Sequence, residues 1–317
     1  MKLRNLYQFF IQEGIKTDLR KKQQIKQALK ENEAVYNNLN RSQKKFFDKD
    51  CLVNPYADTR ILNGGDNHQI KTILVGIDVE VGELLLSQAL SQSGKKVDLV
   101  LGHHPKGIAW AALDDVMHLQ TDLMANLGIK ADIAKHLMKK RITEVSRKLH
   151  GSNHMQSVDA AKLLGIPFMC CHTPADNHVA HYLQKLVGMK KPKRLQDLVD
   201  LLLQEPEYQY AATYRVGPRI FAGQPNDNAG RVFVDMTGGA SGSKDLFPRM
   251  SQVGIGTVLG MHVSENNLVK MKREFLNVVI AGHMASDSLG LNLLFDKLQK
   301  KFDVEILECS GFRRFKR

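Results

Sequence analysis

The hydrophobic pattern of the chain is dominated by short apolar runs that each end at a histidine. The run at 97–102 is followed by His103 and His104, and comparable runs end at His172 and His283. Short aliphatic and β-branched runs bounded by glycine or proline are typical of buried strands. The pattern therefore predicts three buried strands that each deliver a histidine to their carboxyl end.

A carboxylate follows two of these histidines at the same interval. Asp176 is the fourth residue after His172, and Asp287 is the fourth residue after His283. This spacing brings the two side chains of each pair together on a helical turn or on one face of a strand. Open α/β sheets place ligands at the carboxyl ends of their strands. The three strand ends can therefore share one site only if the strands are neighbours in one sheet, a condition that depends on the fold and not on the local pattern.

The chain around the first histidine pair has the pattern of a βαβ unit. A strand is predicted at 73–78, a helix at 83–93 that ends at Gly94, and a strand at 97–102. Two strands joined by such a crossover helix are parallel. Asp78 then ends the first strand near the histidine pair, where it either orients an imidazole or caps a turn.

Helical patterns precede and interrupt this α/β region. The first fifty residues are basic and carry apolar positions at roughly helical spacing, and residues 108–164 are also helical in pattern. Loop-like sequence at 54–67 separates the first helices from the body. We therefore predict a basic helical amino-terminal extension at 1–70 and an α/β metal-binding domain at 71–317, with a helical insertion at about 107–165.

The carboxyl-terminal half holds further predicted strands, at 208–215 and 231–236, which would form a second lobe. A glycine-rich turn follows at 238–244. It fits neither the dinucleotide fingerprint nor the P-loop spacing. The turn is either structural or a phosphate contact made by backbone amides and nearby side chains. The side chains to test for phosphate contact are Ser241, Ser243 and Lys244.

Composition sets the broad class of the protein. The chain has 317 residues, of which 43% are hydrophobic and 25% are charged, as in a soluble globular protein with a sizeable core. No apolar run is long enough to span a bilayer, and no signal peptide is apparent, which predicts a cytoplasmic protein without membrane contact. The four cysteines form no C-x-x-C pair. Cys170 and Cys171 are then either buried small hydrophobes or thiolates near a metal.

The formal net charge is +12, and basic residues gather near both ends of the chain. These residues are either solvated faces of packed helices or an attraction for an anionic partner such as a nucleic acid. No nucleic-acid-binding motif accompanies them, so this partner has only electrostatic support.

In this order the motifs resemble those of the GTP cyclohydrolase I type 2 homologue family, also called the Nif-three-like family. The resemblance implies a Nif-three-like two-lobed α/β fold and a homo-oligomer in the form of a hexameric ring. The last carboxylate of the family is usually glutamate, whereas this chain has Asp287. The family's usual amino-terminal segment is also not recognisable before Ile73. The matching motifs are Ile77-Asp78, His103-His104-Pro105, His172 to Asp176, and Gly282-His283 to Asp287.

The same resemblance implies a site for two metal ions. Three further residues, Asp78, His172 and Lys244, are candidates for a supporting or substrate-binding role. Imidazole with carboxylate suits zinc, iron, manganese, cobalt or nickel better than calcium. The metal ligands implied by the resemblance are His103, His104, Asp176, His283 and Asp287.

Five ligands suit two ions that share a carboxylate, either Asp176 or Asp287. Two such ions, roughly 3.5–4 Å apart, can bridge a water and make it a nucleophile. The first hypothesis is therefore a metal-dependent hydrolase of a small polar or nucleotide-like molecule, with no further catalytic residue identified. The second hypothesis is a non-catalytic, metal-containing regulatory protein that binds a protein or nucleic-acid partner.

Overall fold

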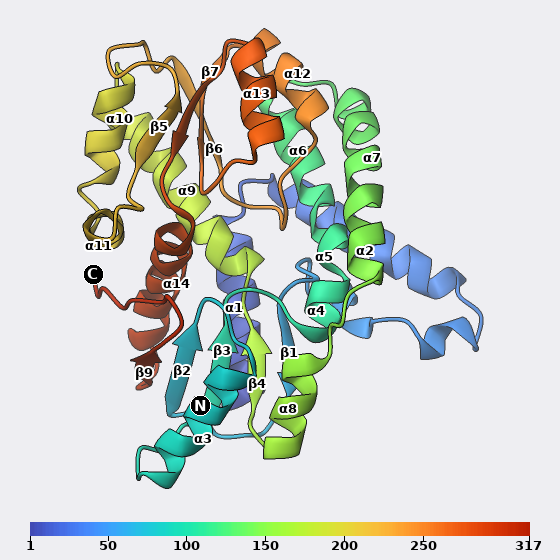
Figure 1. Cartoon of the computed structure of the whole chain (residues 1–317). Coiled ribbons are helices and arrows are strands. Elements are labelled where there is room, and N and C mark those ends of the chain that lie inside the picture. The colour runs from blue at the N-terminus through green and yellow to red at the C-terminus, as the bar shows by residue number, and fades with distance from the viewer.

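The computed structural model describes residues 1–317 and contains two separate β-sheets (Figure 1). The strand order is β1-β4-β3-β2-β9 in the first sheet and β5-β8-β7-β6 in the second. The predicted two-lobed, mixed α/β fold is confirmed. The strands are β1 (Arg60–Asn63), β2 (Thr72–Gly76), β3 (Leu99–Gly102), β4 (Phe168–Cys170), β5 (Arg219–Ala222), β6 (Arg231–Asp235), β7 (Ile255–Gly260), β8 (Asn277–Ile280) and β9 (Glu305–Glu308).

Helices cover both sheets and fill the space between them. Three short 3-10 helices are η1 (Gln43–Lys45), η2 (Lys49–Leu52) and η3 (Lys244–Leu246). None of the helices is long and apolar enough to cross a membrane. The α-helices are α1 (Leu3–Thr17), α2 (Lys22–Asn38), α3 (Val81–Gln92), α4 (Gly107–Ala111), α5 (Leu113–Val116), α6 (His118–Leu127), α7 (Ala131–His150), α8 (Gln156–Leu164), α9 (Thr173–Lys190), α10 (Leu195–Leu202), α11 (Pro206–Thr213), α12 (Phe247–Gln252), α13 (Glu265–Arg273) and α14 (His283–Gln299).

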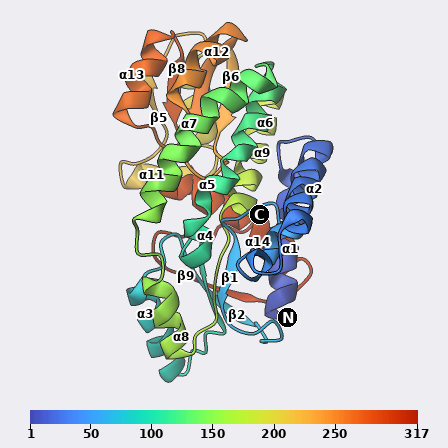
Figure 2. The same ribbon diagram turned by 90° about the vertical axis from the view of Figure 1, so that its right-hand side faces the viewer.

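The first sheet contains the predicted βαβ unit. Strands β2 and β3 are parallel, from the Ile73–Leu99 pair to the Gly76–Gly102 pair, and every residue of both strands is buried. Continuous burial is expected of central parallel strands, because helices cover both of their faces. Figure 2 shows α3 and α8 on one face of this sheet and α1 on the other. Strand β4 lies beside β3 in the same direction, so both strands end at the same edge.

The second sheet corrects two expectations. Strand β8 belongs to this sheet, so the three histidine-bearing strands are not neighbours in one sheet, and the condition that they must be neighbours to share a site is wrong. The predicted strand at 208–215 is also wrong, because most of this segment forms helix α11. Pro206 occupies the first turn of α11, where its missing amide hydrogen is not needed. Tyr208 and Ala211 then both face the core at helical spacing.

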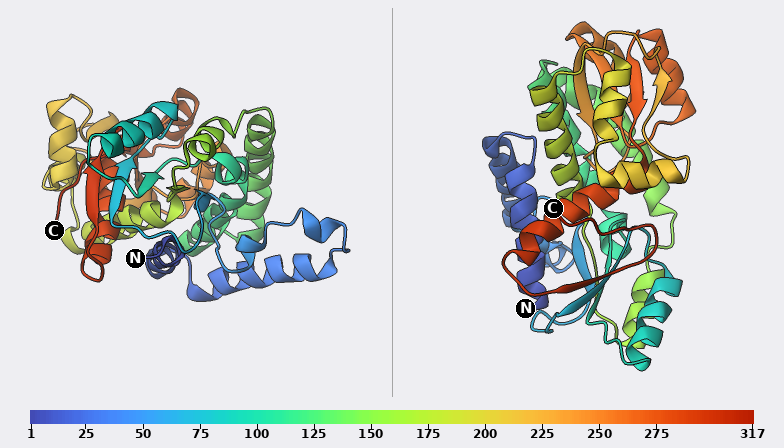
Figure 3. Two further views of the ribbon diagram at one scale, coloured as in Figure 1. Left: turned by 90° about the horizontal axis from the view of Figure 1, so that it is seen from below. Right: turned by 90° about the vertical axis from the view of Figure 1, so that its left-hand side faces the viewer.

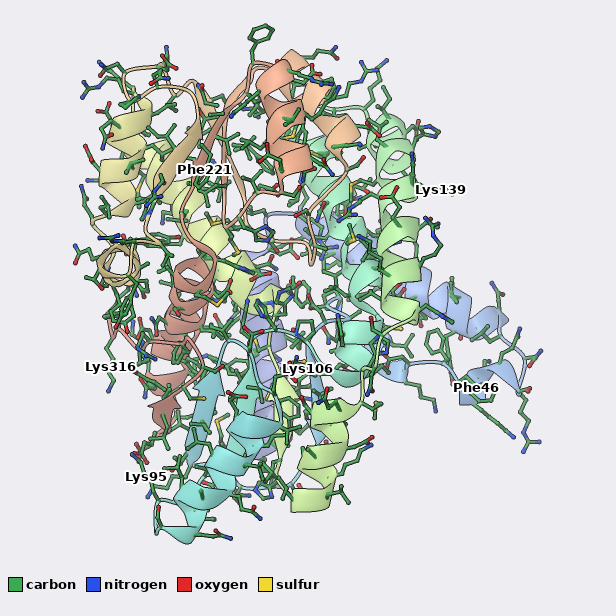
Figure 4. All side chains as sticks on the ribbon, in the orientation of Figure 1. Phe46, Lys95, Lys106, Lys139, Phe221 and Lys316 are labelled. Carbon is green, nitrogen blue, oxygen red and sulfur yellow. The ribbon has the colours of Figure 1, made fainter.

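The beginning of the chain contributes to the core and to the first sheet. Helix α1 packs on α9 and α14, with the Phe10 and Phe295 rings 6.0 Å apart, and β1 forms the edge of the sheet beside β4. By contrast, Ile25 is the sole buried residue of α2. Helix α2 projects from the body, and Phe46 beyond it is 87% exposed (Figures 3 and 4). The domain boundary at residue 70 stays a prediction.

Helices α4 to α8 occupy the stretch between β3 and β4. The side-chain amide of Gln120, on α6, donates to the carbonyls of Gly238 and Ala240 at 2.8 and 2.6 Å. A Cβ on Gly238 would lie 2.5 Å from the Gln120 side chain. This stretch of helices therefore holds the glycine-rich turn of the second lobe in place.

Candidate metal centre

A cluster of imidazoles and carboxylates lies where the two lobes meet. From the first lobe, His103 and His104 directly follow β3, and Asp176 lies on the first turn of α9 after β4. From the second lobe, β8 leads into α14, which begins at His283 and carries Asp287 one helical turn later. Both helices start where a strand ends, so the fourth residue after each leading histidine faces back toward the strand ends. The structure thus brings together all five residues predicted as ligands.

The cluster has two halves that share Asp287. Oδ1 of Asp287 lies 3.5 Å from Nε2 of His103, which is 3.3 Å from Oδ1 of Asp176. Oδ2 of Asp287 lies 3.5 Å from Nε2 of His104 and 3.6 Å from Nε2 of His283. The two oxygens of one carboxylate therefore face different histidines.

His172 also reaches this cluster, with Nε2 3.7 Å from Oδ2 of Asp176. The ligand atoms of three groups lie within 4.8 Å of one another, so each group could hold a metal ion. These groups are His103 with His104 and His172, His104 with His283 and Asp287, and His103 with Asp176 and Asp287.

Four buried polar atoms at the centre of the cluster have no hydrogen-bond partner. They are Nε2 of His103, Oδ1 of Asp176 and both carboxylate oxygens of Asp287. Buried polar atoms are nearly always paired, so a group of unpaired ones needs an explanation. Nitrogen and oxygen ligands at 2.0–2.2 Å from one ion lie about 3.4 Å apart in tetrahedral geometry. The observed separations of 3.3–3.5 Å match that arrangement, so the donor set fits divalent metal ions.

The other ring nitrogen of each first-lobe histidine is held by a fixed acceptor. Nδ1 of His103 lies 3.1 Å from the carbonyl oxygen of Cys171. Nδ1 of His104 is 2.7 Å from Oδ1 of Asp78, and Nδ1 of His172 is 2.7 Å from Oδ2 of Asp58. Such bonds fix the tautomer and ring orientation of ligating histidines and leave Nε2 as the free ligand atom.

The charges of the cluster are strongly coupled. Burial alone would raise the pKa of Asp287, but the charge of His103 outweighs burial and holds that pKa well below its usual range. Burial would lower the pKa of His103, but Asp287 and Asp176 raise it well above the usual value. Burial lowers the pKa of His283, helped by the neighbouring His262. The buried carboxylates therefore favour the protonated, positively charged form of His103, at the centre of the cluster.

The cluster is open on one side only. The His103 and Asp287 side chains are almost fully buried, whereas the His104 side chain is 22% exposed and that of His283 is 37% exposed. A cavity of about 80 Å³ adjoins the cluster and is also lined by Asp235, His262 and part of the glycine-rich turn, from Gly239 to Ser241. Lys244 is exposed and does not line this cavity.

Three residues of the site were not found by sequence reasoning. Asp58 precedes β1, which runs antiparallel to β4, so its position beside His172 depends on a pairing that no local pattern reveals. Asp235 ends β6, where it resembles any turn aspartate. The sequence does contain a pattern that could have identified His262. The apolar strand β7 ends at Gly260, two residues before this histidine, just as β3 ends at Gly102 before His103.

The fold and the cluster together define a class: two-lobed α/β proteins with a buried His/Asp site that could hold metal ions. Among solved structures, the chain is similar to a NIF3 superfamily protein from Sphaerobacter thermophilus, with 27% sequence identity and a TM-score of 0.70. The alignment covers 80% of this chain and 91% of that chain. The Nif-three-like resemblance inferred from the motifs is confirmed, and the fold is that of the NIF3 superfamily.

More distant similarity extends to two other solved structures. Reduced HcgD from Methanocaldococcus jannaschii is 13% identical with a TM-score of 0.49, and the alignment covers 84% of this chain and 94% of that chain. Protein ybgI, described as of unknown function, is 14% identical with a TM-score of 0.48, covering 81% and 91%. No protein-family model and no curated protein matches the chain.

Proposed function

We propose that this protein binds two divalent metal ions in the His/Asp cluster and hydrolyses a small polar substrate there. The observation that carries the proposal is the group of four buried, unpaired polar atoms on His103, Asp176 and Asp287. An unpaired buried carboxylate is strongly unfavourable, and a bound cation relieves that cost.

We assign the ligands in two sets that meet at Asp287. His103, Asp176 and Oδ1 of Asp287 would hold one ion, and His104, His283 and Oδ2 of Asp287 would hold the other. Asp287 is therefore the shared carboxylate in this proposal, a choice that the sequence left open. Bound divalent ions supply Lewis-acid polarisation of a substrate oxygen and acidification of a water molecule. The roles of His172, Asp58 and Asp78 are to orient the imidazoles and to balance charge around them.

Asp235 is the proposed proton donor of the site. Its carboxylate lines the cavity beside the cluster, and burial alone raises its pKa from 3.8 to about 6. A general acid works best when its pKa lies near the operating pH. Asp235 in its protonated form can donate to the leaving group of a substrate held between the cluster and the glycine-rich turn.

Metal content and turnover together test this function. The full chain, purified without chelator, should carry two divalent ions by elemental analysis. His103→Ala and Asp287→Asn should lose them, whereas His136→Ala, on the exposed face of α7, should keep them. Hydrolysis within a panel of phosphoesters and cyclic amides should stop on chelation and return on adding metal. A purified chain that binds no divalent metal at any of these residues would overturn the proposal.

A second candidate is a metal-containing protein that binds an anionic partner. The observation that favours it is the outer face of α7, whose exposed residues include Lys135, Lys139, Lys140, Arg147 and Lys148. In that case metal would be present, no substrate would turn over, and binding of DNA would weaken steeply with salt. A homo-oligomeric ring and a cytoplasmic location are part of the same proposal.

A further inference from the structure

A second, larger cavity adjoins the exposed side of the cluster. Its volume is about 510 Å³, within the range of small-molecule sites. It lies between α11, β5, the start of α14 and the carboxyl-terminal segment, which pass close to one another in the right-hand view of Figure 3. His262 and His283 line both this cavity and the one beside the cluster. A molecule held here would therefore reach the cluster at His283.

Three arginines give this cavity an excess of positive charge. Arg215, Arg219 and Arg313 line it, and none of them forms an ion pair with a carboxylate. Arg219 donates to the carbonyl of Arg215 at 3.1 Å, and Arg313 donates to the carbonyl of Phe312 and to the Tyr210 hydroxyl at 2.7 and 3.0 Å. These partners carry no negative charge, so each guanidinium is available to an anion.

The sole acidic residue that lines the cavity is already neutralised. Glu207 accepts hydrogen bonds from Arg317 at 2.6 Å and from Asn292 at 2.7 Å. The cavity therefore presents unpaired positive charge, which complements an anionic ligand.

Aromatic rings provide the other half of the cavity wall. Tyr210 and Tyr214 are one turn apart at the end of α11, with their rings 5.1 Å apart, and Phe315 lies 6.2 Å from Tyr210. Tyr214 and Phe221 are 64% and 44% exposed. Phe221 on β5 and the tail near Lys316 lie on the same side of the molecule in Figure 4. Exposed ring faces beside cations favour a ligand that is itself planar.

The backbone of this region is fixed against the cluster. Arg215 lies two residues beyond the end of α11 with φ of 66°, a left-handed conformation that glycine usually adopts. Val216 follows Arg215 and lies against Gly282, which has a φ of 111°. A Cβ on Gly282 would be 2.7 Å from the carbonyl oxygen of Val216. Gly282 directly precedes His283. The loop that carries Arg215 is thus pressed onto the residue before a proposed metal ligand.

We propose that this cavity binds an anionic molecule with a planar ring, of about the size of a mononucleotide. The ring lies against Tyr210 and Tyr214, and the anionic group is bound by Arg215, Arg219 and Arg313. This inference rests on the proposed function, because the bound molecule would be the substrate whose reactive group reaches the cluster. The binding itself depends only on the residues of the cavity.

Calorimetric titration of the metal-loaded full chain with three probes tests the proposal. AMP has both a ring and an anion, adenosine has the ring alone, and ribose 5-phosphate has the anion alone. AMP should bind at least tenfold more tightly than either of the other two. Arg219→Ala and Tyr214→Ala should each weaken AMP binding at least tenfold, because both side chains are exposed and their loss leaves the core intact. Lys139→Ala, far away on α7, should leave it unchanged.

The inference is overturned if AMP binds no better than its two parts, or if both cavity variants bind it as the wild type does. A third result would also overturn it: AMP does not bind, and sedimentation shows that Phe221→Asp converts an oligomer to a smaller species. The cavity would then be a contact between copies of the chain. Metal analysis of the same samples separates the two proposals. Metal without AMP binding removes this inference alone, and AMP binding without metal removes the hydrolase proposal alone.

Discussion

Replacing Gly290 with alanine tests whether the crossing of α9 and α14 holds the cluster together. A Cβ on Gly290 would lie 2.4 Å from the carbonyl oxygen of Ala175 and 2.9 Å from its carbonyl carbon. Both are backbone atoms of a helix, so relief requires the two helices to separate. Alanine in a helix interior is favoured over glycine by about 1 kcal/mol. Overpacking a tight contact costs about 1–3 kcal/mol, with backbone clashes at the upper end.

The cost of the clash should therefore exceed the gain in helix propensity, and the free energy of unfolding should fall by about 2 kcal/mol. That loss corresponds to a fall in Tm of roughly 4 °C. Ala175 precedes Asp176, and Gly290 lies one turn beyond Asp287, so separation of the helices also displaces both carboxylates. Metal affinity should then fall at least about tenfold, as expected when ligand geometry is disturbed.

The assay is thermal unfolding of chelated protein together with metal titration, and the matched control is Gly188→Ala. Gly188 lies on the last turn of α9, where an added Cβ meets nothing within 4 Å. This control should gain stability, by roughly 0.5 kcal/mol, and keep its metal affinity. A Gly290→Ala variant as stable as this control, with wild-type metal affinity, would refute the reasoning.

Three further changes act on single buried groups. Asp58→Ala removes the carboxylate bound to His172 and should lower the free energy of unfolding by about 3–5 kcal/mol in urea; a loss below about 1 kcal/mol contradicts that role. The raised pKa of Asp235, about 6 against 3.8, means that the folded state holds a proton that the unfolded state releases. In chelated protein, wild-type stability relative to Asp235→Asn should therefore fall by about 2 kcal/mol as pH rises from 4 to 6. Burial lowers the pKa of His178 from 6.5 to about 4, so wild-type stability relative to His178→Gln should be lost as pH falls from 6.5 to 4, by about 3 kcal/mol. If the stability of wild type and variant changes with pH in parallel, the proposed pKa shift of that residue is contradicted.

Local patterns were sufficient for the parts of the site that lie close together in sequence. The run before His103 predicted β3, and the four-residue spacing from His172 to Asp176 holds on the first turn of α9. These features follow from strand burial and helix periodicity, which are properties of a few neighbouring residues. The grouping of distant segments came from the family resemblance and not from the pattern.

The misplaced strand β8 and the missed Asp58 share one cause, which is strand pairing across long stretches of sequence. Nothing local to β8 indicates that it pairs with β7 in a second sheet, and nothing local to Asp58 indicates that β1 runs against β4. Pairing is decided by which edges remain to be covered once the helices have packed, a property of the whole fold. The strand predicted at 208–215 failed because a short apolar segment does not distinguish a buried helix from a strand.

The position of the cluster follows from a unit that the chain uses twice. Strand β4 leads through His172 into α9, and strand β8 leads through His283 into α14, with an aspartate four residues after the histidine each time. One unit belongs to each lobe, and the two helices pack against each other. Their positively polarised amino-terminal ends meet at the cluster, where they stabilise the two carboxylates as anions. Since Asp287 faces histidines that follow β3 of the other lobe, any shift of one lobe against the other changes distances at the cluster. The proposed metal binding and the position of the lobes are therefore expected to be thermodynamically linked, with each affecting the other by the same free energy.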